Sequence, residues 1–201
     1  MEVLMEGYPG YDPTVKQDSW DAKTRFVLER RVVIVPKLLF FKPDEARALE
    51  AAVARLLPQS RPNPIPVVPF VDEKLARNVT DGTRYEDMPP MRELWRLFVA
   101  TLDEEAQVRH EKRFGALEAE TQDMVLAAIL KGESRSLLWK KIPARLAFEH
   151  IVSTVAAVYY AHPSAWGEIG WGGPKYPGIY VRVRCGRKDT EEAGEVGHVC
   201  D

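Results

Sequence analysis

Helical spacing of apolar residues is the feature that most restricts the fold of this chain. Between residues 44 and 57, apolar side chains recur every three or four positions. The same spacing returns in residues 91–102, 116–130 and 147–160. Because 3.6 residues make one turn, such residues share one face of a helix and must bury it against a neighbour. The sequence therefore predicts a mainly α fold, with residues 147–160 as the central core helix.

Proline and glycine mark where these helices begin and end. Pro43 suits the first turn of one helix, and Pro58 stops its pattern. Gly132 follows the last periodic residue of a later helix, as expected of a C-terminal cap. Pro143 is expected to divide the long apolar segment of residues 137–160 into two helical parts.

Several segments lack a clear helical pattern. Residues 1–24 carry proline, glycine and scattered aromatics and are predicted to form an extended arm. Residues 26–35 are rich in β-branched side chains, which favours a strand or an apolar lead-in. Residues 58–69 hold five prolines and predict an extended connection, which is either a surface linker or a docking strand for a partner. A short helix is expected over residues 71–79.

The character of the chain changes after His162-Pro163. Residues 167–178 are rich in glycine and aromatics, which predicts a loop, with a short strand at residues 179–184. No dinucleotide or phosphate-loop spacing occurs there. The glycines, Gly172, Gly173 and Gly178, are instead expected to permit positive φ and close backbone approach. Two interpretations stay open: a loop folded over its own helices, and an aromatic loop that meets a partner.

Length and charge predict one domain with no general affinity for polyanions. The 201 residues carry a formal charge of −2, which gives no support to nucleic-acid or anionic-membrane binding. We expect an arm over residues 1–24, a helical domain over residues 25–184 and a tail over residues 185–201.

The longest apolar stretch, residues 32–41, is too short to span a bilayer, so no membrane insertion is expected. No twin-arginine or secretory leader is recognised, which predicts a cytoplasmic location unless a leader was removed or a partner carries the chain.

The residues that could carry chemistry form weak patterns. Cys185, His198 and Cys200 could bind a metal, but the spacing is more typical of a tail with free thiols. Residues 104–112, around His110, are typical of a solvated helix face.

An acid–base site is the remaining catalytic alternative. It would use His150, Glu149 or His162, but no recognised catalytic motif supplies a nucleophile or a paired group for them. The sequence therefore predicts no catalytic, cofactor-binding or metal-binding residue in this chain.

Three segments resemble motifs of one family. Phe40-Phe41-Lys-Pro-Asp-Glu, leading to Leu56-Leu57-Pro58, is similar to its "F-F-x-x-x-E … L-I-P" opening. Phe114-Gly-Ala-Leu117 with Gln122 and Leu126 resembles an "F-x-x-L … Q … L" helix. The segment from His162 to Tyr180 resembles "D/H-P-x-x-W-x-x-I-G-[FYW]-x-G-P-x-[YW]-P-x-G-Y". The family is gluconate 2-dehydrogenase subunit 3, and the resemblance spans residues 38–190.

The resemblance implies an accessory role. Members are small helical subunits that bind and stabilise a large flavoprotein of the GMC type, which carries FAD and oxidises a sugar, glycoside or related alcohol. A cytochrome is a possible electron acceptor of such a complex. The residues expected to contact the partner or to shape the contacting loop are Trp166, Ile169, Trp171, Pro174, Tyr176, Tyr180, Pro64 and Pro66. The alternatives are a homo-oligomeric scaffold and the acid–base enzyme described above.

Overall fold

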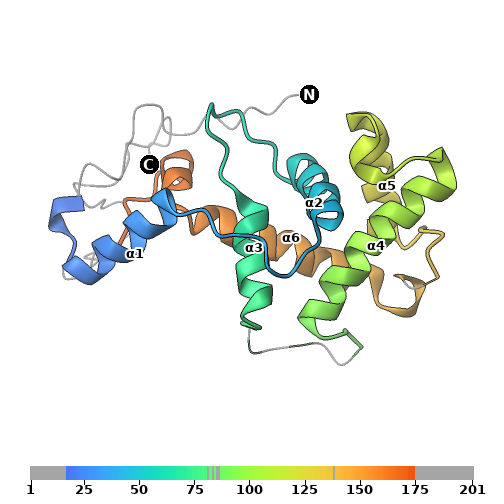
Figure 1. The fold of residues 1–201 in the computed structure, drawn as a ribbon, viewed down its shortest axis with the longest axis horizontal. Coiled ribbons are helices and arrows are strands. Elements are labelled where there is room, and N and C mark those ends of the chain that lie inside the picture. The colour runs from blue at the N-terminus through green and yellow to red at the C-terminus, as the bar shows by residue number, and fades with distance from the viewer. Residues whose placement is uncertain (1–16, 81, 83, 85–86, 138, 175–201) are drawn as a thin grey trace, which may run out of the picture. The chain divides into compact units, whose positions relative to one another are not determined.

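The computed structural model consists of helices joined by loops (Figure 1), which confirms the mainly α prediction. It describes residues 17–80, 82, 84, 87–137 and 139–174. Within these ranges, no helix is both long enough and apolar enough to cross a membrane. The chain divides into two compact units, a larger one of residues 36–158 and a smaller one that joins residues 1–35 to residues 159–201.

The larger unit is built around α2. Its helices are α2 (Pro43–Leu56), α3 (Val67–Ala76), α4 (Met91–His110), α5 (Ala119–Lys131) and α6 (Ala144–Tyr160), with the 3₁₀ turns η2 (Phe114–Ala116) and η3 (Trp139–Lys141). The last two residues of α6 belong to the smaller unit. Helix α2 packs against α3, α4, α5 and η2. Its buried alanines and leucine allow this close approach.

Aromatic rings connect the elements of the larger unit at its core. Phe41 meets Trp95 of α4 with 6.3 Å between ring centroids, and Trp95 lies 6.4 Å from Phe98. Phe98 in turn contacts Phe148 of α6 at 6.0 Å and Trp139 of η3 at 5.9 Å. These near-perpendicular and tilted contacts are the arrangements that aromatic pairs favour. They place α6 in the core, as its apolar sequence predicts.

A buried carboxylate holds the segment before α2. Asp72 of α3 is fully buried, and its oxygens accept the backbone N–H groups of Leu39, Phe40 and Phe41 at 2.6 to 3.1 Å. Buried N–H groups need such partners, and a carboxylate can accept several at once. Asp72 thereby fixes the two adjacent phenylalanines whose rings enter the core.

Glu105 of α4 is a second fully buried carboxylate. It accepts hydrogen bonds from Arg109, from the Ser134 hydroxyl at 2.8 Å and from the Arg135 backbone N–H at 2.7 Å. Burial by itself raises the pKa of Glu105, but these three donors outweigh burial and hold the pKa below its ordinary value. The prediction of a solvated face over residues 104–112 is therefore wrong at this position, because the chain after α5 folds back over it.

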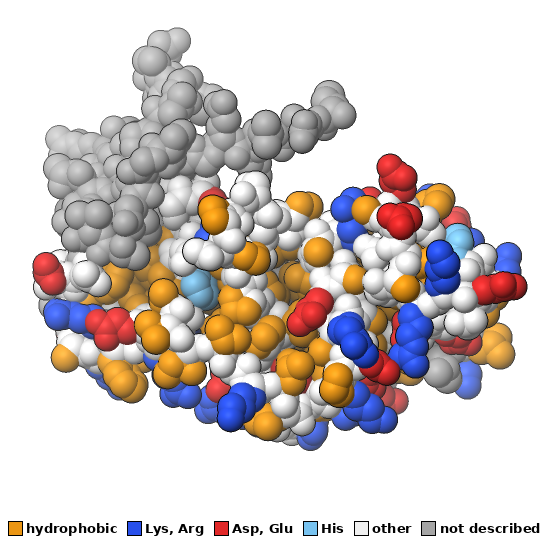
Figure 2. All heavy atoms as spheres, turned by 45° about the horizontal axis from the view of Figure 1, so that its top comes forward, with side chains coloured by type: hydrophobic (Ala, Val, Ile, Leu, Met, Phe, Trp, Pro, Cys, Tyr) orange, Lys and Arg blue, Asp and Glu red, His pale blue; other side chains and the backbone are white. Residues whose placement is uncertain are grey.

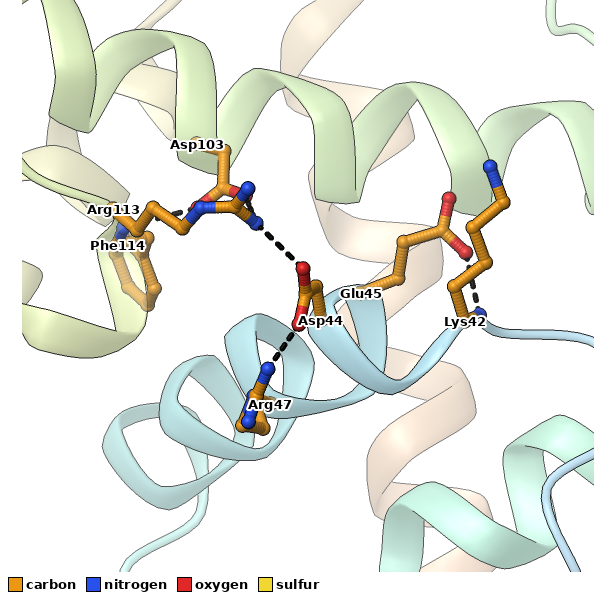
Figure 3. A network of polar contacts seen from close by, with 7 residues as sticks. All are labelled: Lys42, Asp44, Glu45, Arg47, Asp103, Arg113 and Phe114. Carbon is orange, nitrogen blue, oxygen red and sulfur yellow. Dashed lines mark hydrogen bonds and ion pairs between the residues drawn. The ribbon is translucent and has the colours of Figure 1, made fainter.

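Charged residues meet at the N-terminus of α2 (Figure 3). The Glu45 carboxylate accepts the backbone N–H of Lys42 at 2.7 Å, which satisfies one of the unpaired donors of the first turn. Asp44 pairs with Arg47 one turn later and with Arg113 at 3.2 Å, ahead of η2. The hydrogen bond from Arg47 and the charges of both arginines lower the pKa of Asp44.

Most expected helix boundaries are confirmed. Gly132 ends α5 with φ of 72°, and α6 begins immediately after Pro143. The short helix expected over residues 71–79 instead begins at Val67, so that Pro69 lies in its first turn. Proline is tolerated there because the first-turn N–H groups have no partner within the helix.

The smaller unit contains α1 (Ala22–Val33) and the 3₁₀ helix η4 (Pro163–Ile169). The prediction of a strand or apolar lead-in over residues 26–35 is wrong for most of its length, because α1 occupies it. The Asp21 side chain caps this helix by accepting the Thr24 backbone N–H at 2.9 Å. Leu28 packs with Trp20 and Trp166, so tertiary burial overrides the weak helix preference of the β-branched residues.

Candidate partner-binding site

The segment after α6 begins with a capped 3₁₀ helix. Nδ1 of His162 accepts the backbone N–H of Ser164 at 3.2 Å, and Pro163 occupies the first helical position. Proline fits here because its missing N–H would have no helical partner. His162 is buried and acts as the N-cap of η4, a structural arrangement that orients the following residues.

Trp166 forms the base of the site. Its side chain is only 2% exposed, and its indole N–H donates to the carbonyl of Tyr160 at 2.9 Å. The ring meets Trp20 edge-on, with 6.3 Å between centroids and an interplanar angle of 77°. With Leu28, these two rings are the hydrophobic core that joins α1 to η4. Trp166 was expected either to contact the partner or to shape the contacting loop. Its burial fits the second role.

Two glycines let the chain turn back over Trp166. Gly170 caps η4 with φ of 65°, and the next residue, Trp171, donates its backbone N–H to the Trp166 carbonyl at 3.0 Å. Gly173 has φ of 79°, and an added Cβ would lie 3.0 Å from Trp166 and 3.1 Å from Trp20. Gly173 therefore meets the expectation of positive φ and close approach, and the group it approaches is a tryptophan ring.

Three apolar residues of this loop reach its surface. Ile169 is 47% exposed and Trp171 is 38% exposed, while Pro174 is partly exposed. The Trp171 ring rests on Trp166 with 4.4 Å between centroids. We call Ile169, Trp171 and Pro174 the aromatic-loop patch. A buried ring thus supports an exposed one, which is the arrangement of an interface anchor.

Two of the expected contact residues, Tyr176 and Tyr180, lie outside the described residues, as do Gly178 and the strand expected at residues 179–184.

A contact that the sequence did not predict ties α6 to η4. The Tyr159 hydroxyl lies 2.7 and 2.8 Å from the two carboxylate oxygens of Glu168 and can donate to them. This bond holds the loop at the end of the core helix.

The proline-rich connection in the larger unit is a closed loop. The Gln59 side chain accepts the backbone N–H of Ile65 at 2.7 Å and donates to its carbonyl at 3.1 Å. Ile65 is buried, Pro64 is exposed at the outside of the loop, and Pro66 is the partly exposed N-cap of α3. The connection is therefore a pinned loop, and partner contact by Pro64 and Pro66 stays a prediction.

The residues of the acid–base alternative belong to two different units. His150 and Glu149 line an open groove of about 830 Å³ between α6 and the connection of residues 78–91. Glu149 accepts a hydrogen bond from Arg145 at 2.8 Å, one helical turn away. His162 belongs to the smaller unit and caps η4.

Within the described residues, no three His, Cys, Asp or Glu side chains are grouped as metal ligands. The cysteines considered as ligands, Cys185 and Cys200, lie outside them, as does His198.

Comparison with known proteins gives one match. The sequence model of the family described as gluconate 2-dehydrogenase subunit 3 matches residues 43–173, from the first turn of α2 to Gly173. Neither the curated proteins nor the solved structures give a match. The match covers more than half of the chain and includes both Trp166 and Trp171. On this evidence the chain belongs to the gluconate 2-dehydrogenase subunit 3 family.

Proposed function

We propose that this chain is the non-catalytic small subunit of a heteromeric FAD-dependent dehydrogenase. Its partner is a large flavoprotein of the GMC type that oxidises a sugar, glycoside or related alcohol. The observation that carries the proposal is the family match over residues 43–173, since the family is described as the third subunit of gluconate 2-dehydrogenase. A subunit of that description is consistent with an accessory role in a multi-subunit complex.

The aromatic-loop patch supports this function. Exposed aromatic and branched apolar side chains on a well-anchored loop are costly in water and are typical of a surface that a partner covers. Trp171 is held by its ring contact with Trp166, so little conformational entropy is lost when it binds. The patch lies within the matched residues apart from Pro174.

The surroundings of the glycine-rich segment support placing FAD in the partner. A glycine loop that binds a dinucleotide leaves its backbone open to the pyrophosphate. Here the space beside Gly173 is occupied by the rings of Trp20 and Trp166. Packing thus accounts for the glycine, and the proposal assigns no flavin contact to this chain.

The proposal is tested by co-expressing this chain with a large GMC-type flavoprotein subunit from the same organism. Size-exclusion chromatography should show the 22.8 kDa chain eluting with a larger protein that carries flavin absorbance. The flavoprotein expressed alone should be less soluble or less stable to heat, because its docking surface would be exposed. Substrate-dependent reduction of the bound flavin should occur in the complex.

Three results would contradict the proposal. The first is separate elution of a folded chain and an equally stable, active flavoprotein. The second is concentration-dependent self-association of the chain without a foreign partner, which would favour the scaffold alternative. The third is turnover by the purified chain alone that is abolished by His150→Gln, which would favour the acid–base alternative.

A further inference from the structure

Two tryptophans from opposite ends of the chain pack together beneath the aromatic-loop patch. Trp20 lies just before the N-cap of α1 and is 6% exposed, and Trp166 of η4 is 2% exposed. With Leu28 of α1 they form one buried cluster. The support under the aromatic-loop patch therefore comes partly from a segment that is distant in sequence.

Three tryptophan rings follow one another from the interior to the surface. The ring of Trp20 meets that of Trp166 at 6.3 Å between centroids, and the ring of Trp166 meets that of Trp171 at 4.4 Å. Both interplanar angles are 77°, the edge-on arrangement that aromatic pairs favour. We call Trp20, Trp166 and Trp171 the tryptophan series. Trp166 is the link through which Trp20 can set the position of Trp171.

Gly173 supplies a second link between Trp20 and the loop. A Cβ added to Gly173 would lie 3.0 Å from the ring of Trp166 and 3.1 Å from that of Trp20, so the loop backbone rests against both rings. The loop is also held by the Trp171 backbone N–H, which donates to the Trp166 carbonyl at 3.0 Å. Removal of the Trp20 ring would leave a cavity beside Gly173 and free the loop to move.

Helix α1 holds Trp20 in place. The Asp21 side chain caps its first turn, and Arg25 donates to the Trp20 carbonyl at 3.2 Å. Near its C-terminal end, Arg31 donates to the carbonyl of Ala161, which lies between α6 and η4, at 2.8 Å. A helix of 12 residues is marginal in water, so these contacts and the buried cluster keep α1 folded against η4.

We propose that Trp20 is a positioning residue for partner binding, which holds Trp171 through Trp166 in the conformation that docks to the large flavoprotein subunit. The inference rests on the proposed function and extends it to a residue outside the matched family region of residues 43–173. Because Trp20 is almost fully buried, it acts through the other two rings and not by touching the partner.

Preorganisation explains how a buried residue changes affinity. A side chain that is already held in its bound conformation loses little conformational entropy when it binds. If only a fraction of the molecules hold Trp171 in that conformation, the apparent dissociation constant rises by the inverse of the fraction. A competent fraction of about one tenth therefore weakens binding about tenfold. The larger unit has its own aromatic core and should be unaffected.

The first test measures binding of full-chain variants to a large GMC-type flavoprotein subunit from the same organism, by isothermal titration calorimetry. Trp20→Ala should raise the dissociation constant about tenfold, and Trp20→Phe, which keeps a ring beside Trp166, should recover most of the affinity. Phe26→Ala is the matched control, because Phe26 is also an aromatic residue of α1 but is 64% exposed. Apolar and basic side chains reach the surface side by side over the region of α1 (Figure 2). Phe26→Ala should leave binding unchanged.

A double-mutant cycle separates positioning from general destabilisation. If Trp20 acts through Trp171, the double variant Trp20→Ala/Trp171→Ala should bind no more weakly than Trp171→Ala alone. Two independent losses would instead multiply in the dissociation constant. Asp21→Ala provides a milder variant, because it removes the cap of α1 and leaves all three rings in place. Its smaller loss of affinity should likewise disappear in the Trp171→Ala background.

The second test uses the chain alone, labelled with 5-fluorotryptophan. Fluorine-19 NMR reports each of the five tryptophans, and the Trp171 resonance is identified by its loss in Trp171→Phe. In Trp20→Ala and in Asp21→Ala, the Trp171 resonance should shift or broaden. The resonances of Trp95 and Trp139, which belong to the larger unit, should not change.

The outcomes separate this inference from the proposed function. If the unmodified chain does not bind the flavoprotein, the proposed function fails, and the NMR comparison alone decides whether Trp20 positions Trp171. If the unmodified chain binds, three results overturn the positioning role and leave the proposed function intact. They are an unchanged Trp171 resonance in Trp20→Ala, independent losses in the double-mutant cycle, and a loss in Phe26→Ala equal to that in Trp20→Ala.

Discussion

Both carboxylate oxygens of Asp72 lie within hydrogen-bonding distance of the Phe40 backbone N–H, at 3.1 and 3.0 Å. The two residues are 32 positions apart, and the contact joins α3 to the segment that precedes α2. Phe40 is itself buried, with its ring 4.9 Å from that of Phe41. One carboxylate thus fixes the backbone from which both rings enter the core.

Replacing this carboxylate should destabilise the larger unit. In Asp72→Asn, one oxygen becomes an amide that faces a backbone N–H, so a donor meets a donor. We expect a loss of about 1–3 kcal/mol in the free energy of unfolding, which is the usual cost of an unsatisfied buried polar group. The measurement is urea unfolding followed by circular dichroism at 222 nm.

The matched control for that substitution is Asp123→Asn. Asp123 pairs with Arg55 at 2.6 and 2.7 Å, but the pair is on the surface and its side chains are substantially exposed. Exposed pairs contribute about 0–1 kcal/mol, so this variant should unfold near the midpoint of the unmodified chain. Equal losses in the two variants would show that Asp72 has no special structural role.

Glu105→Gln should reduce stability in a manner that depends on pH. The pKa of Glu105 is depressed in the folded chain, so its charged form contributes stability above the unfolded value of about 4.3. That contribution is lost as the pH falls through the folded-state pKa. The difference in urea midpoint between Glu105→Gln and the unmodified chain should therefore be largest near pH 7 and should decrease as the pH is lowered below the unfolded value. A difference independent of pH would mean that shape, and not charge, explains the effect.

Trp166 and Trp171 should respond differently to alanine. Trp171→Ala removes a partly exposed ring, so we expect helicity to be retained and binding to the flavoprotein to weaken by about tenfold. Trp166→Ala removes a buried ring, and large-to-small core changes of this kind cost about 3–5 kcal/mol. Circular dichroism and limited proteolysis near α1 measure the fold, and size-exclusion chromatography measures the complex. Loss of folding in Trp171→Ala would place that residue in the core instead of the interface.

Gly173→Ala should disrupt the smaller unit through two effects. Its φ of 79° is unfavourable for alanine by roughly 1–2 kcal/mol, and the new Cβ would press on Trp166 and Trp20. Gly82 provides the control, since its φ is 77° but no atom lies within 4 Å of an added Cβ. Gly82→Ala should therefore show only the backbone effect. A shift in tryptophan fluorescence is expected for Gly173→Ala alone, and its absence would argue against close packing at this glycine.

The local pattern of the sequence was sufficient for most helices. The structure confirms the boundaries that the sequence predicts for α2, for the end of α5 at Gly132 and for the start of α6 after Pro143. These signals are local, because helical periodicity, proline and glycine act over a few residues. The motif around Trp166 also identified the family from sequence, since a run of spaced aromatics and glycines is specific in itself. The motif did not indicate that Trp166 is buried and that Trp171 is exposed.

Tertiary structure decided what local pattern could not. Helix α1 forms where β-branched residues favour a strand, because Leu28 gains a partner in Trp166 from the other end of the chain. Glu105 is predicted from sequence to lie on a solvated helix face, and the sequence gives no sign that Asp72 is buried, yet both are buried with donors that lie about 30 positions away. Burial of a charge depends on which distant groups the fold brings to it. The sequence by itself thus determined the helices and the family, while long-range packing selected the buried carboxylates, the exposed faces and hence the candidate docking surfaces.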